Sequence, residues 1–162
     1  MKIRSVAFYN RRKGFEVRAS AKKYWYPYAK LKVKPISRDP VVRVFVDGEL
    51  GNEGFTYVLE SGREGTIHIE QVLEYNQDPS YLRDALVYKL TLEAQRRVEE
   101  SSLSKREIIR RLGTSATQFY RLMDQTNYRK SIDQLLSLLN VLDCDVDFSV
   151  RVKGASRSFI DG

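Results

Sequence analysis

The sequence is poor in the residues that build metal centres and nucleophilic sites: among 162 residues it has one cysteine, Cys144, and one histidine, His68. A lone cysteine cannot form an intrachain disulfide, which favours a reducing, cytoplasmic compartment. Neither residue has a companion for metal ligation or nucleophilic catalysis, so we expect a surface histidine and a packing thiol. A glycine-rich phosphate loop is also missing. We therefore expect no metal, no cofactor and no enzymatic activity.

Long apolar runs are missing as well. No stretch approaches the roughly eighteen apolar residues of a membrane span. The first residues, Met-Lys-Ile-Arg-Ser-Val, lack the apolar core of a secretory signal. The sequence thus predicts a soluble protein that does not engage a membrane.

Acidic residues are nearly absent from the first part of the chain. Residues 1–38 carry twelve Lys and Arg and one acid, Glu16, whereas residues 39–79 carry two basic residues and nine acids. Residues 80–153 are mildly basic, with thirteen basic residues and ten acids. The formal charge of +7 and the pI near 9.5 favour a polyanionic partner.

The N-terminal part, to about residue 69, is made of short apolar runs that alternate with polar residues and are broken by turn signals. This pattern predicts a small antiparallel β-sheet. In the segment 24–34 we expect a half-buried strand, in which lysines and tyrosines share the polar face. The alternation places Trp25, Ala29, Leu31 and Val33 on the inner face, and Tyr24, Tyr26 and Tyr28 on the polar face.

The pattern changes near Asp78, where helical periodicity begins. A helix of about twenty residues is predicted, with its apolar residues four apart. Three short helices and a terminal strand, Asp145 to Val152, are expected to follow. We therefore predict an α+β protein with a β-rich domain at 1–78, a helical domain at 79–153 and a flexible tail at 154–162. The apolar positions of the long helix are Leu82, Leu86, Leu90, Ala94 and Val98.

Two helix starts stand close together in the helical part. Ser104 to Glu107 and Ser115 to Gln118 have the pattern of capping boxes, in which we expect the serine and the fourth residue to bind each other's backbone amides. The first of these helices is expected to end at Gly113, because glycine readily takes the left-handed conformation. Apolar residues point inward from both helices: Ile108, Ile109, Leu112, Phe119, Leu122 and Met123. Helix, glycine turn and helix together predict a helix-turn-helix.

A third box-like start, Ser131 to Gln134, opens a leucine-rich helix that extends to Leu142. The run from Ser104 to Asp124, followed by Lys130 to Val146, resembles the lambda-repressor-like, xenobiotic-response-element (Cro/repressor type) family. It is most similar to the branch of small regulators and antitoxins that ends in a β-strand, and the resemblance covers about residues 85–152. It implies a phosphate contact at Lys105, the turn at Gly113, and groove-facing residues at Ala116, Thr117, Tyr120 and Arg121.

Helical geometry predicts the same reading face without the resemblance. At about 100° per residue, a helix that buries Phe119 and Leu122 turns Thr117 and Arg121 outward, with Gln118 and Tyr120 beside them. Arg, Gln and Thr are side chains that bind base edges in the major groove. Asp124 should lie at the far end, away from phosphates. The expected phosphate contacts are Ser104, Lys105, Arg106, Ser115, Arg129 and Lys130, with Arg110 and Arg111 adding positive charge.

The sequence leaves several functions open. The first is a dimeric, sequence-specific regulator that binds double-stranded DNA. It would dimerise through the N-terminal sheet, the terminal strand or both, and the N-terminal sheet could instead sense a signal. The second is an antitoxin whose N-terminal domain neutralises a toxin protein and which controls its own promoter. The third is single-stranded nucleic acid binding by Tyr24, Tyr26 and Tyr28 with their neighbouring lysines. A helical bundle that makes no DNA contact is the remaining reading.

Overall fold

The structure is a computed structural model that describes residues 1–152, so the tail expected at 154–162 lies outside the described residues. The chain divides into two compact units, Met1–Asp84 and a second unit that begins at Ala85. The sequence-based boundary near Asp78 marks the start of the long helix α2 (Pro79–Glu100), which runs through the division between the units. Each unit has its own apolar core.

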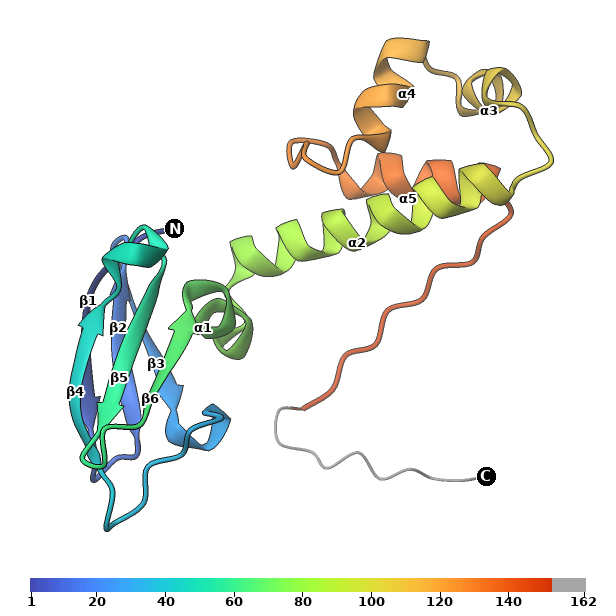
Figure 1. Ribbon diagram of the computed structural model, residues 1–162. Helices are drawn as coiled ribbons and strands as arrows, with labels where there is room; N and C mark the ends of the chain where they lie inside the picture. Colours follow the sequence, from blue (N-terminus) through green and yellow to red (C-terminus); the bar gives the residue numbers. More distant parts are fainter. Residues whose placement is uncertain (153–162) are drawn as a thin grey trace, which may run out of the picture. The chain divides into compact units, whose positions relative to one another are not determined.

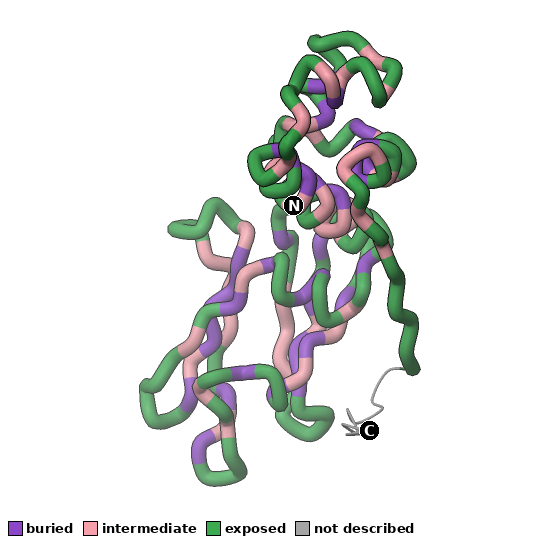
Figure 2. The backbone as a smooth tube through the Cα atoms, turned by 90° about the vertical axis from the view of Figure 1, so that its right-hand side faces the viewer, coloured by how far each residue is buried: buried purple, intermediate pink, exposed green. Residues whose placement is uncertain are grey.

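The first unit contains two antiparallel three-stranded sheets in place of the one expected sheet (Figure 1). Their strand orders are β1-β2-β3 and β4-β5-β6. The strands are β1 (Ile3–Tyr9), β2 (Gly14–Ala19), β3 (Lys22–Pro27), β4 (Val41–Val46), β5 (Gly54–Leu59) and β6 (Glu64–His68). Buried positions alternate with less buried ones in β2 and β3, as one buried face requires, whereas β5 is buried at five of its six positions (Figure 2).

Short helices complete the first unit: the 3-10 turns η1 (Tyr28–Lys30) and η2 (Gly48–Leu50), and the helix α1 (Ile69–Asn76). The sequence reading did not predict α1. It begins in a capping box, in which His68 Nδ1 accepts from the Glu70 amide at 3.3 Å and Gln71 accepts from the His68 amide at 2.9 Å. His68 is thus a helix cap on the surface. Histidine is an uncommon N-cap residue, so no start signal marked this helix in the sequence.

The core of the first unit is centred on Phe15, whose ring lies 5.0 Å from the rings of Tyr28 and Phe55. The expectation that Tyr24, Tyr26 and Tyr28 share a polar face is wrong, since they are only 6, 4 and 7 % exposed. Cross-strand pairing is the reason: Tyr26 lies opposite Phe15 and Tyr24 lies opposite Val17, and paired residues share a face. The strand also ends at Pro27, so the expected strand positions beyond it are not in β3.

The hydroxyls of two of these tyrosines donate to partners within the first unit. Tyr24 donates to the buried Asp78 carboxylate at 2.9 Å, and Tyr28 donates to Asn10 at 2.9 Å. Burial, and then the bond to Asp78, raise the pKa of Tyr24 to about 12. Burial alone would raise the pKa of Asp78, but bonds from the Tyr81 amide, from Tyr24 and from Lys22 together lower it. A charged Asp78 therefore ties β3 to the first turn of α2.

The second unit is a helical bundle of the remaining part of α2 with α3 (Lys105–Leu112), α4 (Ala116–Met123) and α5 (Ile132–Val141). The predicted order of a β-rich part followed by helices is confirmed. The apolar stripe of α2 differs from the expected one, because a step of four residues drifts by about 40° around a helix. Its buried residues are Val87, Thr91, Ala94 and Val98, whereas Leu82 is 39 % exposed.

The expected terminal strand at residues 145–152 is not formed. A strand needs a neighbouring backbone to complete its hydrogen bonds, and no described residue of this chain pairs with the segment. Val146 packs against the helical core, but Phe148, Val150 and Val152 are 65, 96 and 81 % exposed.

Candidate nucleic-acid interface

Helix α3 begins at Ser104, whose hydroxyl accepts from the Glu107 amide at 3.1 Å. The second half of the predicted capping box is absent, because the Glu107 carboxylate binds the guanidinium groups of Arg110 and Arg111 instead. The helix ends at Gly113, which has a φ of 70° and donates its amide to the Arg110 carbonyl. The left-handed conformation that glycine favours therefore lies where the sequence predicted the turn.

Helix α4 follows after a turn of three residues, Gly113 to Ser115. The Ser115 hydroxyl accepts from the Gln118 amide at 3.2 Å and starts the helix. Phe119 and Leu122 hold α4 against the bundle, being 0 and 6 % exposed. Ile108 of α3 is fully buried in the same core. Two short capped helices are thus joined by a tight glycine turn and fixed by one apolar face each.

The outer side of α4 carries the residues that the sequence singled out for base contacts. All five are exposed, and Tyr120 is 55 % exposed, with its ring edge-on to Phe119 at 5.4 Å. They cover the N-terminal and outward sides of one helix: Ala116, Thr117, Gln118, Tyr120 and Arg121. These side chains present a methyl, a hydroxyl, an amide, a phenol and a guanidinium to solvent, a set that can donate to and accept from base edges.

The C-terminal end of α4 is held by side chains from elsewhere in the second unit. The buried Lys130 ammonium donates to the carbonyls of Leu122 and Asp124 at 2.8 and 2.7 Å. Gln95 of α2 donates to the Met123 carbonyl at 2.7 Å. A helix leaves its last carbonyls without intrahelical partners, and a cation there also complements the helix dipole. These bonds fix the end of the outward-facing helix.

The structure therefore corrects the expected phosphate contact at Lys130, which is 6 % exposed and directed into the protein. Burial is the main influence on its pKa and lowers it, against a smaller opposite effect of Asp124. Asp124 itself accepts from the Thr126 amide and hydroxyl, and these bonds lower its pKa. As expected, Asp124 lies at the far end of α4. Sequence reasoning missed the role of Gln95, since no local motif marks it.

The remaining basic residues around the turn fall into two groups. Arg110 and Arg111 share the Glu107 carboxylate, and their hydrogen bonds, that from Arg110 first, lower the pKa of Glu107 to about 2. The others are exposed and form no ion pair within the part of the chain that the structure describes: Lys105, Arg106, Arg121 and Arg129. Ser104 and Ser115 are exposed at the helix starts. The unpaired cations are available to an anionic partner.

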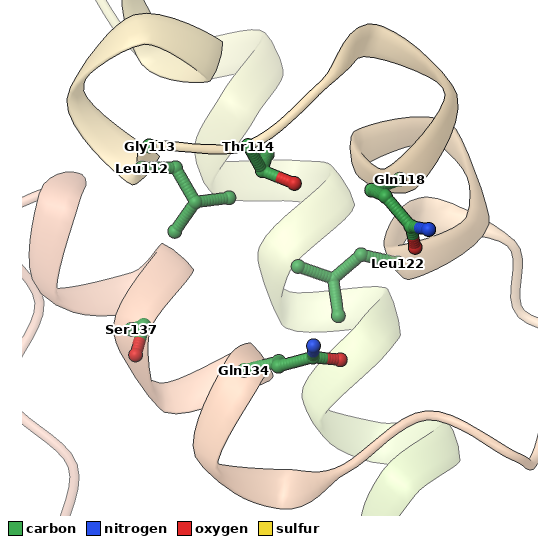
Figure 3. Close-up of a pocket in the computed structure, with 7 residues that line it drawn as sticks. All are labelled: Leu112, Gly113, Thr114, Gln118, Leu122, Gln134 and Ser137. Carbon is green, nitrogen blue, oxygen red and sulfur yellow. The ribbon is translucent and has the colours of Figure 1, made fainter.

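A pocket of about 230 Å³ lies between the turn and α5. Figure 3 shows Thr114 from the turn, Gln118 from α4 and Gln134 from α5 around it, with the side chains of Leu112 and Leu122 between them. Gln118 is thus the one expected base-contacting residue that also borders this pocket. Amide and hydroxyl groups therefore line this pocket together with two leucine side chains.

No helix within residues 1–152 is long and apolar enough to cross a membrane. Across the same residues, no group of three or more His, Cys, Asp and Glu side chains is placed to hold a metal ion. Comparisons of the chain with models of known protein families, with curated proteins and with solved structures find no match.

Proposed function

We propose that this protein is a cytoplasmic, non-enzymatic regulator that binds double-stranded DNA at specific sites and reads the major groove with α4. The observation that carries the proposal is the two-sided character of this helix. Phe119 and Leu122 hold it against the bundle, while Thr117 and Arg121 face solvent on a helix that follows a three-residue glycine turn. In a helix-turn-helix the second helix enters the major groove with the residues of its N-terminal part on the bases.

The exposed side chains suit distinct bases. A guanidinium can form a bidentate pair with the O6 and N7 of guanine, and an amide can do the same with adenine. Arg121 and Gln118 supply these groups, while Thr117 can contact a thymine methyl or a polar base edge. Ala116 and Tyr120 add apolar surface on either side. The bonds from Lys130 and Gln95 support this function because they prevent the end of α4 from fraying.

Phosphate contacts would fix the position of α4 in the groove. Lys105 and Arg106 lie in the first turn of α3, and Arg129 follows α4; all three are exposed. Ser104 and Ser115 stand at helix N-termini, where backbone amides and the helix dipole favour an anion. Such contacts supply affinity that depends on salt but not on sequence.

The proposed regulator binds DNA as a symmetric dimer of two copies of the chain. One small module buries little DNA surface, whereas a symmetric pair reads two half-sites about 34 Å apart. The segment 145–152 carries alternate apolar residues, three of them exposed, and its backbone pairs with none of the described residues. These features suit antiparallel pairing with the same segment of a partner copy.

Selection from a pool of randomised duplexes tests this function. The protein is mixed with the pool at physiological salt, and bound duplexes are recovered, amplified and sequenced over several rounds. We expect an enriched motif with two-fold symmetry. If the protein retains duplexes at low salt but enriches no motif, its binding is only electrostatic, and this result would contradict the proposal.

A further inference from the structure

The outer face of the sheet β1-β2-β3 is unlike the face that packs on the core. Paired residues on adjacent strands share a face, so the registers define its rows. One row joins Ala7, Glu16 and Trp25, and the next joins Tyr9 and Gly14. We call this surface, together with the β1–β2 turn, the basic sheet face. It presents aromatic rings and cations on an open sheet.

Three side chains form a cluster on the basic sheet face. The Arg12 guanidinium lies 4.4 Å from the ring centroid of Trp25 and 5.4 Å from that of Tyr9. The two rings are 6.2 Å apart. Tyr9 is 38 % exposed, Arg12 is exposed and Trp25 is half-buried. Rings and a guanidinium plane therefore stand together at the surface of the unit.

Gly14 makes this arrangement possible. A Cβ at this position would lie 2.1 Å from an atom of the indole ring, so the ring rests directly on the glycine backbone. The turn that carries Arg12 is anchored as well: Asn10 donates to the Val41 carbonyl and accepts from Tyr28, both at 2.9 Å. The cluster is thus held in place before any ligand arrives, which lowers the cost of ordering on binding.

Residues 1–38 carry twelve exposed Lys and Arg residues and a single acid. Two of these cations, Arg18 and Lys23, pair with each other two positions along β2 and β3 from Glu16 and Trp25, so they share the face of the cluster. The single acid, Glu16, lies within 3.6 Å of Arg18 and 3.8 Å of Lys23, so its charge is already offset by two cations. The neighbouring turn adds Arg11 and Lys13. This surface is complementary to a polyanion.

We propose that the basic sheet face binds a single-stranded polynucleotide, with bases stacked on the cluster of Tyr9, Arg12 and Trp25 and phosphates near the surrounding cations. Stacking on aromatic rings within a basic surface is the way proteins hold unpaired strands, and guanidinium planes stack on bases too. A duplex keeps its base faces covered and would leave the cluster unused. The inference is separate from the proposed function of α4.

Trp25 is the only tryptophan of the chain, so its fluorescence reports this site alone. The full chain is titrated with oligothymidylate and oligouridylate of about 15 nucleotides, a length that spans a typical site. We expect saturable quenching by one or both strands, and their ratio distinguishes DNA from RNA. A random-sequence blunt duplex should leave the emission unchanged. Equal quenching by the duplex, or no quenching by either strand, would overturn the proposal.

Variants locate the binding surface, with affinity measured by anisotropy of labelled oligonucleotides. Arg12→Ala and Trp25→Leu should each weaken single-strand binding about tenfold, which is typical of a lost stacking partner. Gly14→Ala should do so without removing a charge or a ring, because the added methyl displaces the indole. Lys89→Ala removes one exposed cation from α2 and should leave binding unchanged. Native affinity in folded Arg12→Ala and Trp25→Leu would refute the assignment.

Discussion

At the scale of single residues, two adjacent cations behave in opposite ways. Arg129 is exposed, whereas Lys130 turns inward and caps the carbonyls of Leu122 and Asp124. A lysine suits this position because its long apolar stem is buried with the core while its ammonium supplies several donors. Arg129 is therefore available to a partner, whereas Lys130 is used within the fold, although the two residues are adjacent in the sequence.

We predict that Lys130→Met destabilises the fold by about 2 kcal/mol, because charge-assisted hydrogen bonds to buried carbonyls are lost. Urea denaturation followed by circular dichroism measures this loss. Arg129→Met, which removes an exposed cation, is the matched control and should change stability little. If Lys130→Met keeps native stability but binds duplex more weakly, then Lys130 contacts a DNA phosphate and does not hold the end of α4.

The Glu107 carboxylate pairs with Arg110 and Arg111 and so offsets part of the positive charge near the turn. Glu107→Gln should strengthen binding to random duplex DNA and steepen its salt dependence by about one, because Arg110 and Arg111 are released. Glu99→Gln removes an exposed carboxylate of α2 and is the control for net charge. Binding is titrated over a salt series. An effect of Glu99→Gln equal to that of Glu107→Gln would mean that only total charge matters.

The same carboxylate gives a pH dependence. Its pKa is lowered from 4.5 to about 2 by the bonds from Arg110 and Arg111, so folding favours the charged form. The stability that it contributes is present above pH 4.5 and is lost as the pH falls towards 2. The Glu107→Gln protein should therefore lose less stability than the native protein over this interval.

At the scale of elements, the turn between α3 and α4 depends on one backbone conformation. Gly113 has a φ of 70°, and a Cβ there would meet nothing within 4 Å. Gly113→Ala should therefore cost about 1 to 2 kcal/mol through backbone strain alone. Gly48→Ala, at a position without positive φ and with its nearest atom 4.0 Å away, is the control and should be neutral. Stability is measured by thermal unfolding. Native stability of Gly113→Ala would mean that residue 113 does not take the left-handed conformation.

The helices of the second unit were predictable because their signals are local. Ser104, Ser115 and Gly113 mark starts and an end, and the apolar residues between them follow the helical period. The outward residues of α4 follow from the same geometry. The partners of Glu107 were not predictable, because two arginines on the same helix compete with its own capping bond.

The strands of the first unit were harder to predict because their facing depends on partners distant in sequence. In Tyr24-Trp25-Tyr26 either face is apolar enough to be buried, and pairing with Phe15 and Val17 decides in favour of the tyrosines. The Tyr24 hydroxyl is tolerated there because the Asp78 carboxylate accepts its hydrogen bond, just as Asn10 accepts from the buried Tyr28. No short motif in the sequence records such contacts.

At the scale of the whole molecule, we predict a dimer that depends on the segment 145–152. Light scattering at micromolar concentration should give the mass of two chains. Val150→Asp should shift the protein towards the monomer, because a charge would replace an apolar residue within the paired strands. Asp147→Asn, on an exposed position of the same segment, should leave the dimer intact. A native protein that is monomeric at this concentration and binds its selected duplex fully would contradict the prediction.

If α4 reads the sequence of a duplex, the loss of a base contact and the loss of a phosphate contact must have different effects on binding. Arg121→Ala and Lys105→Ala are titrated on the selected duplex and on a random duplex across a salt series, with circular dichroism as the check on folding. Arg121→Ala should lose about 1 to 3 kcal/mol on the selected duplex and little on the random one. Lys105→Ala should weaken both similarly and lower the salt slope by about one. Unchanged affinity of Arg121→Ala for the selected duplex would contradict the proposed role of α4.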